Sequence, residues 1–254
     1  MFDDRRMRRL ESQVDALRTR EKDSDTRKTY DQVFDRAALL TIASLIGDGV
    51  IATLDYPVST GKEANIFHAT DERGRAKAVK IYRIATATFR NIAVYLEGDP
   101  RFKKVKKAIK PTIFAWAQKE YKNLVRMDDA GARVPKPERV IDNMLVMEYI
   151  GDENQPAPTV KEIPIEDPDE LFADVVRNMK AIRHAELVHA DLSEYNLLYW
   201  DSGVVVIDVG QAVTIDHPRA AEWFKRDASN IARFFARHGV KVTPQDLERE
   251  VLED

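Results

Sequence analysis

The stretch HADLSEYN, residues 189–196, combines residue types that could carry chemistry. Four residues separate Asp191 from Asn196, and a downstream run of valine and isoleucine ends at Asp208, which lies two residues before Gly210. A carboxylate can orient or accept the proton of a nucleophile, while carboxamide and carboxylate oxygens are ligands that Mg²⁺ prefers. The same residues would also suit a loop with buried polar caps. The spacing alone therefore leaves two interpretations, a magnesium–nucleotide site or a capped loop.

Two further charged residues fall where burial would be costly. Lys80 lies within a strand-like segment, between Val79 and Ile81, and Glu120 lies four residues from Trp116 and from Leu124 on one helix face. Unpaired charges in a core are expensive, so an ion pair between Lys80 and Glu120 would explain both positions. Kinases use such a pair to hold a lysine against nucleotide phosphates. An ordinary internal ion pair is the alternative.

A short segment of small residues, Ser59, Thr60 and Gly61, precedes Lys62 between two predicted strands. Its backbone N–H groups could close over phosphate oxygens, although a simple hairpin turn would have the same sequence character. The P-loop pattern requires glycine six positions before its lysine, and Tyr56 stands there. The sequence therefore disfavours a P-loop ATPase.

Hydrophobic periodicity predicts the elements that must position these residues. We expect helices over 5–20, 30–46, 111–130, 168–185, 218–238 and 244–252, and strands over 50–54, 64–70, 76–82, 140–150 and 204–208. Segment 83–110 has much charge and little periodicity, which is typical of a functional or mobile loop. Segment 152–168 is acidic and rich in proline, as expected of a linker or surface excursion.

Strands therefore dominate before residue 150 and helices dominate after it, which predicts an α+β fold of two lobes. We expect residues 1–50 to be a helical N-terminal extension packed on the first lobe. Residues 51–150 would form that lobe, with its glycine turn, strand lysine and flexible loop 83–110. Residues 151–254 would form a helical second lobe that carries the catalytic and metal-binding loops.

Composition restricts the possible classes of protein. The chain has 254 residues, 44% of them hydrophobic and 33% charged, and its net charge of −3 gives no overall attraction to nucleic acid. The absence of cysteine excludes disulfides, thiol catalysis and cysteine-bound metal. Neither a bilayer-length apolar run nor a secretory signal is visible, so we expect a cytoplasmic protein without a membrane partner. Arg101–Lys110 holds six basic residues and no acid, a candidate contact for a polyanion.

Taken in order along the chain, these motifs resemble the RIO family of atypical serine/threonine protein kinases, in its type-one branch. The resemblance rests on STGKEAN, AVKIYR, KEYKNL, MEYIG, HADLSEYN and IDVGQAV, and extends over about residues 22–235. It implies a two-lobed protein-kinase-like fold whose smaller helical lobe lacks the usual activation segment. The type-two branch carries an N-terminal winged-helix domain, which does not suit the first fifty residues because they show no strand pattern.

The resemblance implies a nucleotide-binding role for each matching position. Lys80 would hold the phosphates of ATP, and Glu120 would anchor Lys80. The adenine would bind the backbone of Glu148 and Ile150, with Met147 behind it. The glycine turn of residues 59–62 would cover the phosphates.

It also implies the catalytic groups and the setting. Asp191 would be the proton acceptor, and Asn196 and Asp208 would bind Mg²⁺, or Mn²⁺ in its place. Asp208 is also expected to accept phosphate transiently, so the protein would act as a kinase, an ATPase or both. Its implied partner is the pre-small-subunit ribosomal particle, with rRNA and ribosomal proteins, and Arg101–Lys110 is a candidate RNA contact. We expect any autophosphorylation at Thr86, Thr88 or Thr112, within or beside the charged loop.

The sequence differs from ordinary protein kinases in two of their motifs and in the length of the segment after Gly210. Ala190 replaces the arginine of His-Arg-Asp, Val209 replaces the phenylalanine of Asp-Phe-Gly, and only 44 residues follow Gly210. We interpret His189 as a packed residue that braces the loop through hydrogen bonds. Two alternatives remain: a small-molecule phosphotransferase of the aminoglycoside or choline kinase type, and a non-catalytic assembly factor that binds ATP.

Overall fold

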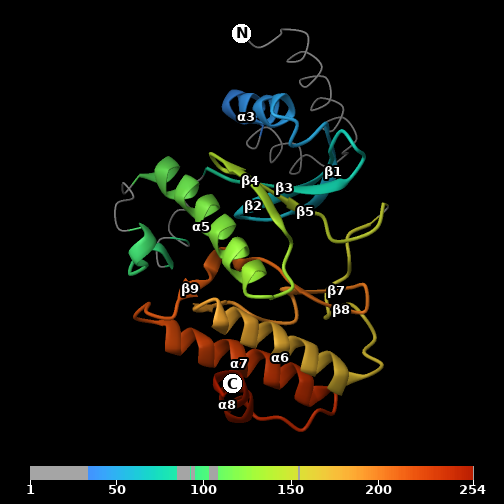
Figure 1. The fold of residues 1–254 in the computed structure, drawn as a ribbon, viewed down its shortest axis with the longest axis vertical. Helices are drawn as coiled ribbons and strands as arrows, with labels where there is room; N and C mark the ends of the chain where they lie inside the picture. The colour runs from blue at the N-terminus through green and yellow to red at the C-terminus, as the bar shows by residue number, and fades with distance from the viewer. Residues whose placement is uncertain (1–33, 85–91, 93–94, 103–107, 154, 254) are drawn as a thin grey trace.

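A five-stranded antiparallel sheet forms one half of the molecule and helices form the other (Figure 1). The computed structural model describes residues 34–84, 92, 95–102, 108–153 and 155–253. The sheet has the order β1-β2-β3-β5-β4, from strands Thr53–Thr60, Ala64–Thr70, Ala76–Tyr82, Met144–Glu148 and Pro137–Ile141 respectively. Helix α3 (Arg36–Gly47) and helix α5 (Ile109–Asp129) cover its two faces.

The pleat of β3 decides which side chains meet which helix. Successive side chains of a strand point to opposite faces, and Val79 and Ile81 belong to the apolar cluster under α3. Ala78 and Tyr82 instead belong to the cluster that includes α5. Lys80 lies between them in this alternation, so the strand itself aims Lys80 at α5.

Helix α3 begins with a side-chain cap. The carboxylate of Asp35 accepts a hydrogen bond from the Ala38 amide at 2.8 Å, which satisfies one of the unpaired N–H groups of the first turn. Ile42 and Leu45 bury its apolar face against the sheet. The predicted helix over 30–46 thus begins later than expected, and the predicted helix over 5–20 lies outside the described residues.

The prediction of one strand over 140–150 is wrong, because the chain reverses within it. β4 ends at Ile141, Asp142 adopts a left-handed conformation with φ 51°, and β5 begins at Met144. A polar residue tolerates this conformation, and a two-residue turn joins antiparallel strands. The Asn143 side chain donates to the carbonyl of Tyr82 at 2.6 Å, which ties the turn to β3.

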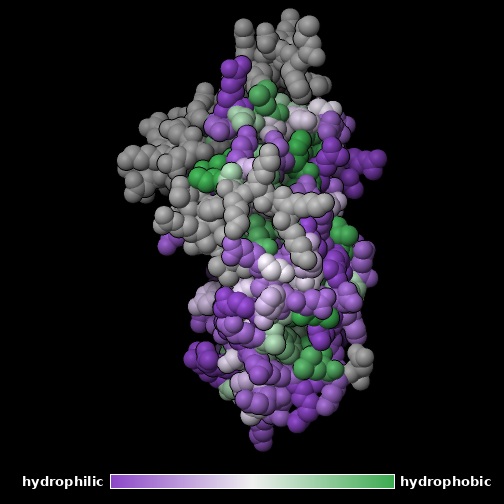
Figure 2. Space-filling model, turned by 90° about the vertical axis from the view of Figure 1, so that its left-hand side faces the viewer, coloured by the Kyte–Doolittle hydropathy of each residue, from purple (hydrophilic) through white to green (hydrophobic). Residues whose placement is uncertain are grey.

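The helical half follows the predicted pattern closely. Its helices are α6 (Pro168–His184), α7 (Ala220–Arg237) and α8 (Pro244–Leu252). Two small antiparallel two-stranded sheets support the loops, β6 (Leu187–Val188) with β9 (Val213–Thr214), and β7 (Leu197–Trp200) with β8 (Gly203–Val206). Figure 2 shows that one face of this half is largely hydrophilic, with some hydrophobic residues. Among the described helices, none is long and apolar enough to cross a membrane.

Segment 83–110, predicted as a functional or mobile loop, is packed in its described part. Pro100–Phe102 forms a 3₁₀ turn, the short helix η1. Ile92, Leu96 and Phe102 are buried in the same core cluster as much of α5, and Asp99 is fully buried. Apolar side chains spaced along a charged sequence were not recognised as a core-facing set. Residues 85–91, 93–94 and 103–107 lie outside the described residues.

Candidate active site

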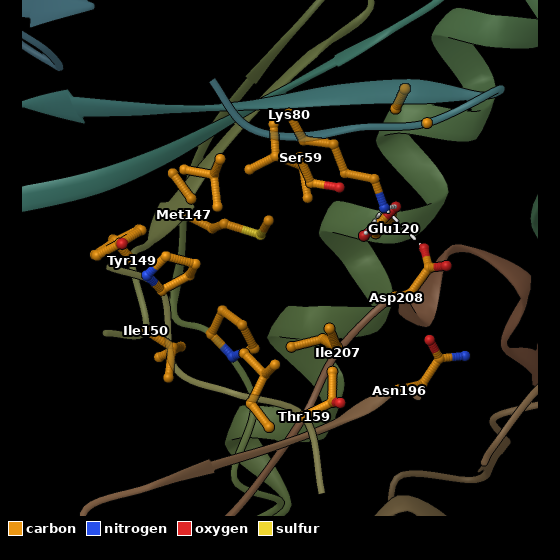
Figure 3. Close-up of a pocket in the computed structure, with 18 of the residues that line it drawn as sticks. Ser59, Lys80, Glu120, Met147, Tyr149, Ile150, Thr159, Asn196, Ile207 and Asp208 are labelled. Atoms are coloured by element: carbon orange, nitrogen blue, oxygen red, sulfur yellow. Dashed lines mark hydrogen bonds and ion pairs between the residues drawn. The ribbon is translucent and has the colours of Figure 1, made fainter. Parts of the chain in front are cut away.

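A cavity of about 660 Å³ lies between the sheet and the helical half (Figure 3). Most of the predicted site residues line it, namely Ser59, Gly61, Lys62, Lys80, Glu120, Met147, Glu148, Ile150, Asn196 and Asp208. Thr60 and Asp191 are the predicted residues that do not. The cavity therefore brings together residues that lie far apart in the chain, from the turn at residues 59–62 to Asp208.

Lys80 is the charged centre of this cavity. Its Nζ donates to both carboxylate oxygens of Glu120 at 2.9 Å and to Oδ1 of Asp208 at 2.8 Å (Figure 3). The predicted ion pair with Glu120 is thus confirmed, and the contact with Asp208 is an addition. Burial alone would lower the pKa of Lys80, but the charges of Asp208 and Glu120 outweigh it and raise the pKa above its ordinary value. The lysine therefore stays protonated.

Glu120 has a second partner, Tyr82, which the sequence reasoning missed. The hydroxyl of Tyr82 donates to Oε2 of Glu120, and both side chains are almost completely buried. Tyr82 follows Lys80 by two residues on β3, so it projects from the same face of the strand. Burial and the charge of Glu120 raise the pKa of Tyr82, which keeps the phenol as a donor. This period-two spacing beside the lysine was the signal that could have revealed Tyr82.

Asp208 leaves strand β8 in a strained conformation that turns its carboxylate into the cavity. Its backbone has φ 58° and ψ 49°, in the left-handed region that few non-glycine residues adopt. The charge of Lys80 lowers the pKa of Asp208. One oxygen pairs with Lys80 while the side chain remains 48% exposed, so the other oxygen is positioned for a further cation.

The backbone of Asp191 orients the carboxamide of Asn196. Its Nδ2 donates to the backbone carbonyl of Asp191 at 2.8 Å. This directs Oδ1 the other way, and Figure 3 shows that oxygen on the side of Asp208. Burial, with repulsion from Asp208, raises the pKa of the Asp191 carboxyl. Such a carboxylate is more basic than an ordinary aspartate, as a proton acceptor requires.

Buried polar residues hold the backbone around Asp191. Asp227, on α7 and 2% exposed, accepts from the amides of Ala190 at 2.7 Å and Leu192 at 2.9 Å. Asp227 was missed because a lone aspartate on a helix gives no pattern. The ring Nε2 of His189 lies 3.1 Å from the carbonyl of Ile207, which confirms the predicted hydrogen-bonded brace. Burial lowers the pKa of His189 and keeps the ring neutral.

The segment that joins the two halves offers backbone and apolar surface to the cavity. Glu148 ends β5, and its amide donates to the Lys136 carbonyl at 2.8 Å. The carbonyl of Ile150 accepts from the Ala157 amide at 3.0 Å. A bound base could therefore not use the Glu148 amide, which already donates to Lys136, while Met147 supplies apolar surface behind it.

An antiparallel sheet over a helical half, with a buried lysine–glutamate pair and an Asp-x4-Asn loop between them, defines a two-lobed phosphotransferase of the protein-kinase-like class. The RIO domain family model matches residues 65–247 of the chain. The chain belongs to the RIO family of kinases. Its fold is the predicted α+β arrangement of two lobes.

Individual relatives agree with this assignment and with the type-one branch. The RIO-type serine/threonine-protein kinase Rio1 of Haloferax volcanii is 44% identical over 251 residues, which cover 99% of this chain and 87% of that protein. Rio1 of Methanocaldococcus jannaschii is 37% identical over 95% of this chain and 83% of its own. The human serine/threonine-protein kinase RIO1 is 37% identical over 91% of this chain but only 41% of the human protein.

A solved structure of the Rio2 kinase from Chaetomium thermophilum has the same fold. It aligns with a TM-score of 0.57 at 21% identity, over the whole of this chain and 90% of that one. That structure is an ADP/Mg²⁺-phosphoaspartate complex. At this level of identity the likeness supports the fold alone.

Proposed function

We propose that this protein is an ATP- and Mg²⁺-dependent atypical serine/threonine kinase that also hydrolyses ATP. The observation that carries the proposal is the triple contact of Lys80 with Glu120 and Asp208 inside the cavity. A protonated, buried lysine between two carboxylates is poised to receive phosphate oxygens, because only Asp208 needs to give up its contact. Glu120 then keeps Lys80 in place.

The metal would be held by Asp208 and Asn196. Both supply oxygen ligands, and Mg²⁺ typically binds one or two carboxylates together with water and substrate phosphates. The described residues contain no cluster of three or more acidic, histidine or cysteine side chains that could hold a metal. A site with one carboxylate and one carboxamide therefore suits Mg²⁺ bound together with a nucleotide, and Mn²⁺ could replace it. When bound, the cation would neutralise charge on the phosphates.

The remaining lining residues would orient the nucleotide. Adenine would lie against Met147 and the backbone of Glu148 and Ile150, and the phosphates would pass under residues 59–62. Gly61 makes the close turn there: its amide donates to the Ala64 carbonyl at 2.9 Å, and a Cβ would lie 3.0 Å from that oxygen. A side chain at residue 61 would crowd the Ala64 carbonyl, so glycine suits the turn that would face the phosphates.

Transfer would proceed through Asp208 or to a hydroxyl acceptor. In the first route a carboxylate oxygen of Asp208 bonds to the γ-phosphorus, the bond from that phosphorus to the bridging oxygen breaks, and ADP leaves. Water then cleaves the acyl phosphate, which releases inorganic phosphate and restores Asp208. Asp191 would accept the proton of the water or of a serine or threonine hydroxyl. The first route would form a phosphoaspartate, the species named in the Rio2 complex.

The proposed setting is maturation of the small ribosomal subunit in the cytoplasm, which rests on the family resemblance. The structure narrows how the basic segment Arg101–Lys110 could contact RNA. Arg101 is bound to the buried Asp99, whereas Lys110 is exposed. Residues 103–107 carry four of the six basic side chains and lie outside the described residues. A search for co-purifying pre-ribosomal particles at low salt tests this setting.

Of the three threonines proposed as autophosphorylation sites, the structure describes Thr112 alone. Thr112 is buried in the first turn of α5, which disfavours phosphate transfer to it in this conformation. Thr86 and Thr88 lie outside the described residues and stay as predictions. Phosphopeptide mapping decides between them.

The test of the enzymatic proposal is ATP turnover with matched variants. We expect the wild-type protein with Mg²⁺ to release phosphate or autophosphorylate, and the Asp191→Ala variant to lose this while still binding ADP. Equal turnover by both proteins would refute the proposal, and equal cellular function would favour a non-catalytic assembly factor. Phosphorylation of choline or an aminoglycoside would favour the small-molecule alternative.

A further inference from the structure

Two buried side chains of α5 hold the loop that carries Asp208. The Nδ2 of Asn123 donates to the carbonyls of Val209 at 2.8 Å and Ala212 at 2.9 Å. Lys119, one helical turn earlier, donates through Nζ to the carbonyls of Gly210 at 2.7 Å and of Ala212. Three carbonyls in the four residues after Asp208 are thus bound by one face of one helix. Since Glu120 on the same helix holds Lys80, α5 positions both partners of the Lys80–Asp208 contact.

Asn123 is in turn held by Arg101, which lies 22 residues earlier in the chain. The guanidinium donates through one terminal nitrogen to Oδ1 of Asn123 at 2.8 Å. Its other terminal nitrogen donates to Oδ2 of Asp99 at 2.7 Å, and its Nε donates to Oδ1 at 3.0 Å. Burial opposes ionisation of Asp99, but the hydrogen bonds and charge of Arg101 outweigh it and lower the pKa of that carboxyl. Asp99 is fully buried and so fixes the guanidinium in one orientation.

The hydrogen bonds that run from Arg101 through Asn123 to the loop allow only one orientation of the Asn123 carboxamide. A guanidinium can only donate, a carbonyl can only accept, and a carboxamide has one end of each kind. Arg101 therefore forces the oxygen of Asn123 toward itself and the Nδ2 toward Val209 and Ala212. Without a donor on its oxygen, the carboxamide could rotate and present that oxygen to the two carbonyls, where it would repel them.

We propose that Arg101 is a positioning residue of this kinase, which fixes the metal-binding loop through Asn123. The inference rests on the proposed role of Asp208 in magnesium–nucleotide binding. Arg101 contacts neither nucleotide nor acceptor, since it does not line the cavity. It acts on the backbone from Val209 to Ala212, whose position sets where the Asp208 carboxylate stands. A residue that the charge pattern suggested as an RNA contact thus serves the active site instead.

The turn that presents Arg101 is itself tied to the helical half. The ring Nε2 of His217 lies 2.8 Å from the carbonyl of Glu97, and the ring stacks on Trp223 with centroids 4.8 Å apart. Gly98 next to it has φ 92°, and a Cβ there would lie 3.0 Å from the same ring nitrogen. Contacts on both sides of Asp99 therefore hold the guanidinium at a fixed distance from Asn123.

The test measures how ADP binding depends on Mg²⁺, by calorimetry on the full chain. Arg101→Lys keeps the charge but loses the fork that spans Asp99 and Asn123. Asn123→Asp keeps an acceptor for Arg101 but loses donors to the loop. Partners that orient metal ligands typically change metal affinity about 10- to 100-fold when replaced, so we expect the half-saturating Mg²⁺ concentration to rise at least about tenfold in each variant. Binding of ADP without Mg²⁺ should stay close to that of the wild type.

Two controls separate this role from a merely structural one. Arg126→Gln removes another arginine of the same region, which donates from α5 to the Ala185 carbonyl at 2.6 Å without touching the metal-binding loop, and its Mg²⁺ dependence should not change. The double variant Arg101→Lys with Asn123→Asp should be little worse than the worse single variant, because both break one relay. Fully additive effects, or an unchanged Mg²⁺ dependence in folded Arg101→Lys protein, would overturn the inference. A wild-type protein that binds ADP without any Mg²⁺ dependence would instead refute the proposed function.

Discussion

The two carboxylates that contact Lys80 should differ greatly in their contribution to stability, although their distances are nearly equal. Nζ lies 2.9 Å from Glu120 and 2.8 Å from Asp208, but the Glu120 side chain is 2% exposed and that of Asp208 is 48% exposed. Breaking a buried pair costs about 3–5 kcal/mol, because it leaves an uncompensated buried charge. Pairs exposed to water contribute about 0–1 kcal/mol. Burial, not distance, should therefore set the order.

The perturbation is a pair of isosteric variants, Glu120→Gln and Asp208→Asn. Asp208 still compensates Lys80 in the first variant, so we take the lower end, about 3 kcal/mol. For a chain of this size 1 kcal/mol corresponds to about 2–4 °C, so Tm should fall by roughly 6–12 °C. Asp208→Asn should lower Tm by no more than about 4 °C, since it also relieves repulsion with Asp191.

Thermal unfolding followed by circular dichroism, without nucleotide, measures both shifts. Tyr82→Phe is the matched control, because it removes one donor to Glu120 and leaves all charges in place. Its cost should lie near 1.5–3 kcal/mol, about the value of a hydrogen bond to a charged group, and so below that of Glu120→Gln. The reasoning is refuted if Asp208→Asn destabilises the protein as much as Glu120→Gln, or if Glu120→Gln unfolds within a degree or so of the wild type.

Three further outcomes are expected. A Cβ at Gly210 would lie 2.9 Å from Oε2 of Glu120, so Gly210→Ala should lower the free energy of unfolding in denaturant by about 1–3 kcal/mol. An unchanged free energy of unfolding would show that the Lys80–Glu120 pair can shift freely. Asp227→Asn loses one of two buried backbone donations, worth about 1–3 kcal/mol, and should slow ATP turnover while ADP affinity persists; lost ADP binding would contradict this. Asp99 has a lowered pKa, so its contribution is complete above its ordinary value of 3.8 and is lost as the pH falls below it. Asp99→Asn should therefore show a weaker loss of Tm on acidification from about pH 5 to pH 3, and an unchanged slope would count against it.

Sequence patterns predicted the fold where the burial of one apolar face decides the local structure. The helices of the second lobe follow their apolar stripes, so α6 and α8 begin at the prolines that were expected. The prediction of one strand over 140–150 was wrong because only Asp142 and Asn143 separate its two apolar runs. This turn contains no glycine, the residue that usually marks such a turn in the sequence. The packing of segment 83–110 was not predicted because its high charge obscured Ile92, Leu96 and Phe102, whose burial depends on distant helices.

In the site, too, local patterns predicted some residues, whereas others depend on contacts between distant parts of the chain. Lys80 and Glu120 could be paired from sequence, because each is costly to bury alone and the strand and helix periods aim both inward. The roles of Asp227, Asn123 and Arg101 could not be predicted, because Asp227 and Asn123 bind backbone groups of loops whose course no local pattern reports, and Arg101 binds Asn123. A polar side chain that satisfies a distant carbonyl leaves no spacing in the sequence. Their roles follow only from tertiary contacts.

The charges of the site also explain why a nucleotide complex with a divalent cation fits this cavity. At the Lys80 contact one positive charge faces two carboxylates, those of Glu120 and Asp208. Lys80 contacts both of these carboxylates, and the pKa of the Asp191 carboxyl is raised by burial and by the charge of Asp208. Phosphates alone would add to the negative charge and repel Asp208. Entry of ATP therefore requires a cation beside Asp208, which predicts that EDTA weakens ADP binding in the wild type far more than in Asp208→Asn.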